Sequence, residues 1–233
     1  MKKRKNPFAD LTEFERCLWS VSMAVIVLSA LMMGGADILS VIASLIGVTA
    51  LIFVAKGYVL GQLLTVVFAV FYGMISFHHR YYGEMITYLG MTSPMAIAAA
   101  IAWLKHPFAQ TKEVAVRPMT RRTVLWLTVS SLAVTVVFYF ILGALGNAGL
   151  VMSTLSVATS FLASALTYLR SPYYALAYAA NDMVLIVLWC IAMAEDISCL
   201  SMVLCFVMFL LNDLYGFFHW RGMEKRQKST HST

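Results

Sequence analysis

Charged residues are scarce in this sequence of 233 residues, where aspartate, glutamate, lysine and arginine together make up 12%. Soluble domains are typically about a quarter charged, so this chain lacks the polar surface that a water-soluble protein needs. Apolar residues instead make up 61%, and the mean hydropathy is +0.81. At about 20 residues per membrane crossing, the length allows about eight transmembrane helices and excludes an additional soluble catalytic domain.

Residue patterns for metal binding and for soluble catalysis are absent as well. The four cysteines, Cys17, Cys190, Cys199 and Cys205, show no CxxC spacing, which argues against a disulfide framework or a zinc site. The common phosphate-binding, dinucleotide-binding, metalloprotease and serine-hydrolase motifs do not occur. We therefore expect no enzymatic activity, no metal and no cofactor. The net charge of +6 lies in the connections and tails, which favours a role in membrane orientation over nucleic-acid binding.

Long apolar runs predict an all-α integral membrane protein with about eight transmembrane helices. With both termini on one side, all but one of the 17 lysines and arginines fall on that side, Arg80 being the exception. The opposite side carries Asp37, Glu84, Glu195 and Asp196. The positive-inside rule then predicts that both termini are cytoplasmic. The predicted helices span residues 18–33, 38–55, 58–77, 85–104, 124–145, 150–169, 173–193 and 198–219.

An internal repeat emerges when the sequence is compared with itself at an offset of 114 residues. The basic loop after the second predicted helix then aligns with the loop after the sixth, and the fourth helix aligns with the eighth. Helices two to four and six to eight are thus two copies of one three-helix unit, with the fifth helix as a linker that restores the orientation. Parallel repeats of this kind occur in transporters, which bind substrate near the membrane midplane at the repeat interface. The predicted divisions are 1–36 for the tail and an extra N-terminal helix, 37–106 for the first unit, 107–147 for a basic loop and the linker helix, 148–220 for the second unit, and 221–233 for a tail.

Polar side chains within the apolar runs are the candidates for a substrate site, because they are costly in lipid and normally face a wet cavity or the bundle interior. Asp182 is the strongest candidate, since a carboxylate near the midplane needs a proton, water or a donor. Asp213 lies nearer the inner interface, where we expect it to pair with a basic residue of the tail. The alternative for the amides and hydroxyls is a structural role in hydrogen bonds between helices. The predicted substrate-binding residues are Gln62, Thr65, Tyr72, Tyr178, Asn181, Asp182, Trp189, Asn212 and Tyr215.

Two further predictions concern helix ends and a helix break. Trp103, Trp126 and Trp220 lie near predicted helix ends, where tryptophan commonly anchors a helix at the membrane interface. Thr92, Ser93 and Pro94 predict a kink in the fourth helix with freed backbone carbonyls, which membrane proteins tolerate beside a cavity.

Two stretches of the sequence carry a further, more specific pattern. The first stretch, 47–107, includes Ala55-Lys56-Gly57, Tyr72, Tyr82-Gly83-Glu84, Pro94-Met95 and Trp103. The second, 168–223, includes the runs 181–189 and 212–221. In their order and spacing these residues resemble the PnuC family of bacterial vitamin transporters, whose members carry nicotinamide riboside. The resemblance implies a SWEET-like arrangement of three plus one plus three helices with an additional N-terminal helix. It also implies a homotrimer in the bacterial cytoplasmic membrane and facilitated diffusion of the vitamin, made net inward by phosphorylation in the cytoplasm.

The chain departs from the family in its seventh predicted helix. The family's Trp-x-x-Trp, followed four residues later by Asn, falls here on Ala175, Tyr178 and Asp182, and a Gln that commonly follows Pro-Met is Ala96. A cationic pyridinium ring still suits this set, because it favours aromatic faces and a nearby carboxylate. The helix centres hold no lysine or arginine, which favours the riboside over a phosphorylated nucleotide. The open alternatives are a proton-coupled carrier, a carrier of another small vitamin or nucleoside (thiamine, riboflavin or a deoxynucleoside), and a structural membrane subunit.

Overall fold

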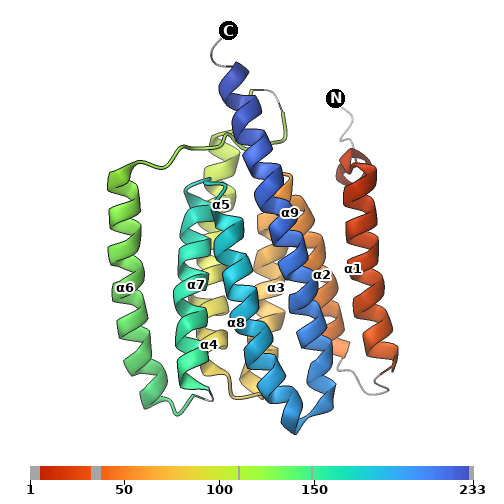
Figure 1. Ribbon diagram of the computed structural model, residues 1–233, viewed down its shortest axis with the longest axis vertical. Coiled ribbons are helices and arrows are strands. Elements are labelled where there is room, and N and C mark those ends of the chain that lie inside the picture. Colours follow the sequence, from red (N-terminus) through yellow and green to blue (C-terminus); the bar gives the residue numbers. More distant parts are fainter. Residues whose placement is uncertain (1–5, 33–37, 110, 148, 231–233) are drawn as a thin grey trace.

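The computed structural model describes residues 6–32, 38–109, 111–147 and 149–230, which form a bundle of long helices (Figure 1). Eight helical segments are long and apolar enough to cross a membrane, which confirms the predicted number. At a rise of 1.5 Å per residue, about 20 residues span the hydrocarbon core of roughly 30 Å. The elements are η1 (Pro7–Asp10), α1 (Glu13–Met32), α2 (Ile38–Ala55), α3 (Val59–His78), α4 (Tyr82–Ile86), η2 (Thr87–Thr92), α5 (Ser93–Lys105), α6 (Arg121–Ala144), α7 (Leu150–Tyr168), α8 (Tyr174–Glu195), η3 (Ile197–Cys199) and α9 (Leu200–Thr230).

The helices run alternately up and down, so both ends of the chain lie at one end of the bundle, which we call the terminal end (Figure 1). Every described lysine and arginine except Arg80 belongs to a connection or helix turn near this end. Glu84 and Glu195 lie toward the opposite end, whereas the predicted outer residue Asp37 lies outside the described residues. The predicted asymmetry of charge therefore recurs in the folded chain. The stretch predicted as a tail from 221 onward is helical, because α9 continues to Thr230.

The connections that follow α2 and α7 have the same backbone conformation. Each contains one left-handed residue, Gly57 with φ 69° after α2 and Arg170 with φ 60° after α7. The next N–H then closes the helix end by donating to a carbonyl five residues back: Tyr58 to Phe53, and Ser171 to Leu166. The same turn also closes α3 at Arg80 and α6 at Gly146, so it is a recurrent helix end in this fold and leaves the predicted repeat a prediction.

Two buried tryptophans join the three-helix units near the terminal end. Trp103 of α5 donates its indole N–H to the carbonyl of Thr167 in α7 at 3.1 Å, and Trp220 of α9 donates to Val54 in α2 at 3.0 Å. The two ring centroids lie 5.5 Å apart. The two tryptophans thus join α5 to α7 and α9 to α2. The expectation that these rings anchor the lipid interface was wrong, since they are at most 1% exposed.

The fourth predicted helix is irregular where a break was expected: a π-helical segment, η2, lies between α4 and α5. The predicted kink with freed backbone carbonyls stays a prediction. Pro94 occupies the first turn of α5. Proline has no N–H to donate to the preceding turn, and its ring displaces the carbonyl there, so the regular ladder cannot continue through this point. The wider π-helical turn absorbs this defect over Thr87–Thr92. The π-helical turn changes the direction in which the side chains of η2 leave the helix.

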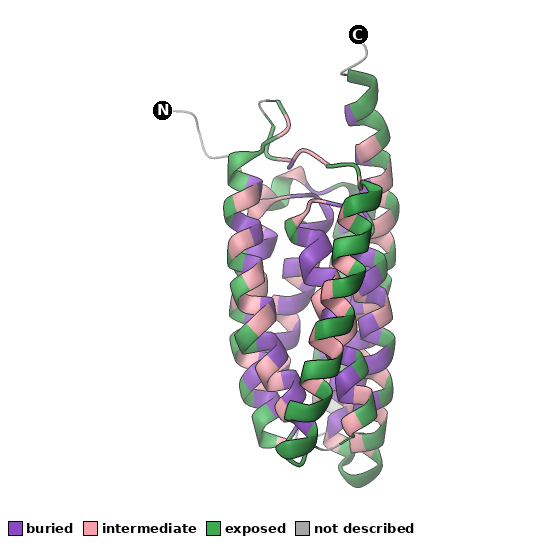
Figure 2. Cartoon of the chain, turned by 90° about the vertical axis from the view of Figure 1, so that its left-hand side faces the viewer, coloured by how far each residue is buried: buried purple, intermediate pink, exposed green. Residues whose placement is uncertain are grey.

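Buried residues gather in the interior of the bundle, and exposed residues line its outer helices (Figure 2). The main core lies among α2, α3, α8 and α9 and includes the large rings of Tyr72, Trp189 and Phe206. The helix α6 packs mainly against α7, and Leu142 is its one buried residue. An apolar helix with so little burial has its surface toward lipid or toward another chain. The predicted role of α6 as a linker between two repeated units stays a prediction.

Candidate functional site

A cavity lies between the two three-helix units and is bounded by α2, α3, η2, α8 and α9. Its volume is about 40 Å³. A water molecule needs about 10–15 Å³ on this scale, so the space suits a few waters and is smaller than a nucleoside. The lining residues are Gly47, Ala50, Leu51, Val54, Gln62, Thr65, Phe68, Tyr88, Thr92, Tyr178, Asp182, Phe209 and Asp213.

Two glycines, Gly61 and Gly47, allow close packing beside this cavity. A Cβ atom at Gly61 would lie 2.4 Å from the backbone nitrogen of Val54, so glycine is what allows α3 to lie directly on α2. At Gly47, a Cβ atom would lie 2.2 Å from the ring of Phe209, so this glycine makes the space into which α9 inserts that ring. These close approaches bring the polar side of α3 to the cavity.

The cavity brings together Gln62, Thr65, Tyr178 and Asp182, all predicted from the sequence to bind substrate. Gln62 is 2% exposed and Asp182 is 3% exposed. The Thr65 hydroxyl donates to the carbonyl of Gly61 at 2.9 Å, and the Tyr178 hydroxyl lies 3.3 Å from the Ser164 hydroxyl. The Oδ2 atom of Asp182 is buried and has no hydrogen-bond partner in the described part of the chain. This oxygen is available to a ligand.

Asp213 also lines the cavity, although the sequence analysis assigned it to the inner interface. It is 3% exposed, and it shares the cavity with Asp182 of the adjacent helix α8. No basic residue in the described ranges forms an ion pair with it, so the expected pairing with the tail was wrong. The signal for its location was the repeated Asn-Asp dipeptide, which places one acid on each of two adjacent helices.

Tyr72, Trp189 and Asn181 do not line the cavity and instead make hydrogen bonds between helices. The indole N–H of Trp189 donates to the Tyr72 hydroxyl at 2.9 Å, which joins α8 to α3. The Oδ1 atom of Asn181 accepts hydrogen bonds from three hydroxyls of α7, those of Ser156, Thr159 and Ser160, at 2.9–3.1 Å. Their predicted contact with substrate stays a prediction.

Glu84 is a buried acid whose position the sequence analysis missed. It is 0% exposed, and its Oε2 atom accepts a hydrogen bond from the Ser156 hydroxyl at 3.1 Å. Ser156 Oγ also lies 3.1 Å from Asn181 Oδ1, so its single O–H is shared between the two acceptors and links Glu84 to the polar contacts between α4, α7 and α8. The sequence placed Glu84 in a loop because its neighbours, Tyr82 and Gly83, resemble a connection.

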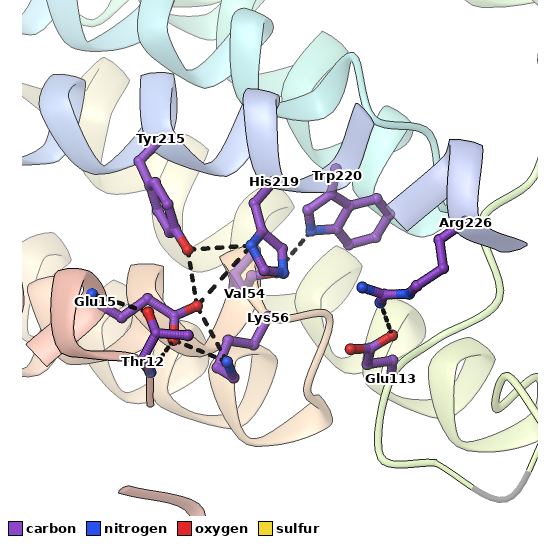
Figure 3. Close-up of polar contacts among 9 residues, drawn as sticks. All are labelled: Thr12, Glu15, Val54, Lys56, Glu113, Tyr215, His219, Trp220 and Arg226. Carbon is purple, nitrogen blue, oxygen red and sulfur yellow. Dashed lines mark hydrogen bonds and ion pairs between the residues drawn. The ribbon is translucent and has the colours of Figure 1, made fainter. Parts of the chain in front are cut away.

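Asn212 and Tyr215, the remaining predicted site residues, face α1. The Asn212 amide donates to the Ser22 hydroxyl at 3.1 Å. The Tyr215 hydroxyl donates to the Oε1 atom of Glu15 at 2.8 Å (Figure 3). Both contacts attach α9 to the N-terminal helix. Their predicted contact with substrate also stays a prediction.

The buried side chain of Glu15 is the centre of a polar cluster at the terminal end, formed by Thr12, Glu15, Lys56, Tyr215 and His219 and called here the Glu15 cluster (Figure 3). The Lys56 ammonium lies 3.1 and 2.9 Å from the two carboxylate oxygens. Thr12 and Glu15 cap α1 reciprocally, since each backbone N–H donates to the other side chain. The imidazole Nδ1 of His219 lies 4.0 Å from Glu15. The cluster joins α1 to the end of α2 and to α9.

The chemistry of the cavity suits recognition of an uncharged or positively charged molecule. Its lining offers two carboxyl groups, an amide, hydroxyls and the rings of Phe68, Tyr88, Tyr178 and Phe209. No lysine, arginine or histidine is among the lining residues. Aromatic faces and carboxylates attract cations. Within the described residues, no group of three or more histidine, cysteine, aspartate or glutamate side chains could hold a metal ion.

Comparisons with known proteins match nearly the whole chain. A sequence model of the family described as nicotinamide mononucleotide transporter matches residues 37–222. The nicotinamide riboside transporter PnuC of Neisseria mucosa is 26% identical over 228 residues, which cover 96% of this chain and 86% of that protein. The crystal structure of the vitamin B3 transporter PnuC superposes with a TM-score of 0.82 at 25% identity, covering 93% of this chain and 94% of the other.

Proposed function

The chain belongs to the nicotinamide mononucleotide transporter family, and we propose that it carries nicotinamide riboside across the membrane through the cavity between its two three-helix units. It is a membrane transporter of a vitamin-type nucleoside and not an enzyme. The observation that carries the choice of substrate is the charge of the cavity. Two carboxyl groups line it, and its lining has no basic side chain.

This charge favours the riboside over the mononucleotide. The pyridinium ring of nicotinamide riboside is a cation, which the rings of Tyr88 and Tyr178 and the carboxyl group of Asp182 can attract. A phosphate adds roughly two negative charges and normally requires arginine or lysine as a partner. Beside Asp182 and Asp213, a phosphate would be repelled. The amide of Gln62 and the hydroxyls of Thr65 and Thr92 can take the ribose and carboxamide groups.

The position of the protein in the cell follows from its charge distribution. We place it in the bacterial cytoplasmic membrane, with the terminal end in the cytoplasm, because the basic residues gather at that end. Riboside that is released there can be phosphorylated, and the phosphorylated product no longer suits the cavity. This keeps the net flux inward.

The cavity must widen to admit the substrate, since its volume is about 40 Å³. Transport therefore requires movement of the helices that bound it. For the mode of transport, the sequence favoured facilitated diffusion, with proton coupling as the alternative. The two acids in the lining, Asp182 and Asp213, support proton coupling, because the site can then bind protons as well as the substrate.

A homotrimer is part of the proposal, as the family resemblance implies. The face of α6 that points away from α7 is apolar and has no partner within the described chain, and it offers a surface that copies can share. The mass of the complex in nanodiscs tests this. A single-chain mass would contradict it.

Uptake into proteoliposomes tests the substrate. Labelled nicotinamide riboside should show saturable uptake, which unlabelled riboside competes away and nicotinamide mononucleotide at the same concentration does not. Thiamine, riboflavin and deoxynucleosides, assayed in parallel as competitors, test the other ligands that the sequence left open. Empty liposomes are the control. No saturable riboside flux from active, folded protein would reject the assignment.

A further inference from the structure

Two acids of adjacent helices meet in the wall of the cavity. Asp182 of α8 and Asp213 of α9 are each 3% exposed, and both line the same cavity of about 40 Å³. The Oδ2 atom of Asp182 is buried and has no hydrogen-bond partner in the described ranges. Two ionised carboxylates in one small, low-dielectric cavity repel each other strongly, so at least one of them must hold a proton.

The groups that surround the pair supply no positive charge. The titratable groups that face it are Tyr174 and Tyr178 on α8, Tyr88 on η2 and Cys205 on α9, all neutral near pH 7. The parts of α2 and α3 that line the cavity contribute only uncharged residues. A buried negative charge without a counter-ion is costly. When no cation is in the cavity, we therefore expect both carboxyl groups to be protonated, so that the pair carries no charge.

We propose that the Asp182–Asp213 pair exchanges one proton for each singly charged cation that enters the cavity. The pair starts with two carboxylic acids. As the cation arrives, one O–H bond breaks and its proton passes to water on the side from which the cation came. One carboxylic acid, one carboxylate and the cation remain, and their total charge is zero. The inference rests on the proposed function, because nicotinamide riboside with its pyridinium charge is the cation concerned.

The consequence for transport is an electroneutral exchange. The cation leaves on the other side of the membrane, and the pair takes up a proton from that side before it returns. Each riboside that moves in one direction is then matched by one proton that moves in the opposite direction. Both the loaded and the empty carrier cross their closed states without a net charge in the cavity, which avoids the cost of a buried charge.

Proton release on binding is the first test. The purified protein is titrated with nicotinamide riboside by calorimetry in two buffers with different ionisation enthalpies. We expect about one proton released per ligand, and a Kd that falls up to about tenfold per pH unit while the empty pair is fully protonated. The uncharged dihydronicotinamide riboside should bind without proton release. Riboside binding with no buffer dependence between pH 6 and 8 would overturn the proposal.

Variants separate the pair from other buried acids. In the double variant Asp182→Asn/Asp213→Asn, riboside binding should release no proton, and the preference for the cation over its dihydro analogue should fall about tenfold or more. The control is Glu84→Gln, which removes an equally buried acid that does not line the cavity. This variant should still release one proton per riboside. Thermal unfolding of each variant shows that it is folded.

Flux against a proton gradient is the second test. Proteoliposomes are set to pH 6.5 inside and 7.5 outside, with the membrane potential clamped by valinomycin and potassium. One-to-one exchange should accumulate riboside inside about tenfold, because one pH unit is a tenfold ratio of protons, and reversing the gradient should reverse the ratio. Equal riboside concentrations inside and outside under both pH gradients would refute the proton exchange. They would leave the proposed riboside transport intact, because riboside would still have crossed the membrane. Absence of any riboside binding or flux would instead reject the proposed function.

Discussion

Substitution of Lys56 should destabilise the protein strongly, because it leaves the Glu15 carboxylate buried without its counter-ion (Figure 3). Glu15 is 0% exposed and Lys56 is 7% exposed. Removing one partner of a buried ion pair typically costs about 3–5 kcal/mol. In Lys56→Met the N–H of Thr12 and the hydroxyl of Tyr215 remain as donors to Glu15, so we expect the lower end of this range, about 3 kcal/mol. For a chain of this size, that lowers the Tm by roughly 6–12 °C.

Thermal unfolding at a fixed detergent concentration, followed by tryptophan fluorescence, measures this change. The matched control is Lys112→Met, which breaks the ion pair with Asp10, where the Lys112 side chain is 45% exposed. An exposed pair contributes about 0.2–1 kcal/mol, so this control should shift the Tm by only a few degrees. The double variant Glu15→Met/Lys56→Met should be more stable than Lys56→Met alone, because it leaves no unpaired charge. A Lys56→Met shift no larger than that of Lys112→Met would refute the reasoning.

Three further predictions test helix packing, the junction of the units and the topology. Gly61→Ala should lower the Tm, because a Cβ atom at Gly61 would lie 2.4 Å from a backbone nitrogen of α2. Gly222→Ala should not, because a Cβ atom there would meet nothing within 4 Å. Equal Tm shifts of the two variants would contradict this packing. Trp103→Phe should cost about 0.6–1.7 kcal/mol by loss of its interhelical hydrogen bond, measured by denaturant unfolding, and no change in stability would show that the bond is dispensable. In a cysteine-free background, Ser229→Cys should react with an impermeant maleimide only after cells are opened, and Ile197→Cys should react in intact cells; the reverse pattern would invert the proposed orientation.

The bundle could be predicted because lipid imposes simple constraints on a sequence. Apolar runs of membrane length predicted the number of crossings. The distribution of lysine and arginine predicted that the two ends of the bundle differ in charge. Pro94 predicted the irregularity in the fourth helix, since proline cannot continue the hydrogen-bond ladder. The burial of Trp103 and Trp220 was missed, because a tryptophan near a helix end can anchor to the interface or bind a neighbouring helix. Only the position of that neighbour decides between these roles.

The candidate site was harder to predict, and α9 shows the physical reason. The helical period groups Asn212, Tyr215 and His219 on one side and sets Asp213 about 100° away. The grouping is correct, but the period does not say which side faces the cavity. A central membrane helix has neighbours all round, so both sides can be polar. The partner on the opposing helix decides, and here Glu15 of α1 lies opposite Tyr215.

The two polar sides of α9 also limit how the cavity can open. Asp213 faces the cavity, while Asn212 and Tyr215 are bonded to α1. A rotation of α9 alone that carried Asp213 outward would break both bonds, and each buried group left unpaired costs about 1–3 kcal/mol. We therefore expect α1 and α9 to move as one body. We therefore expect the cavity to widen by movement of its opposite wall. There the π-helical segment η2 contributes Tyr88 and Thr92 to the lining.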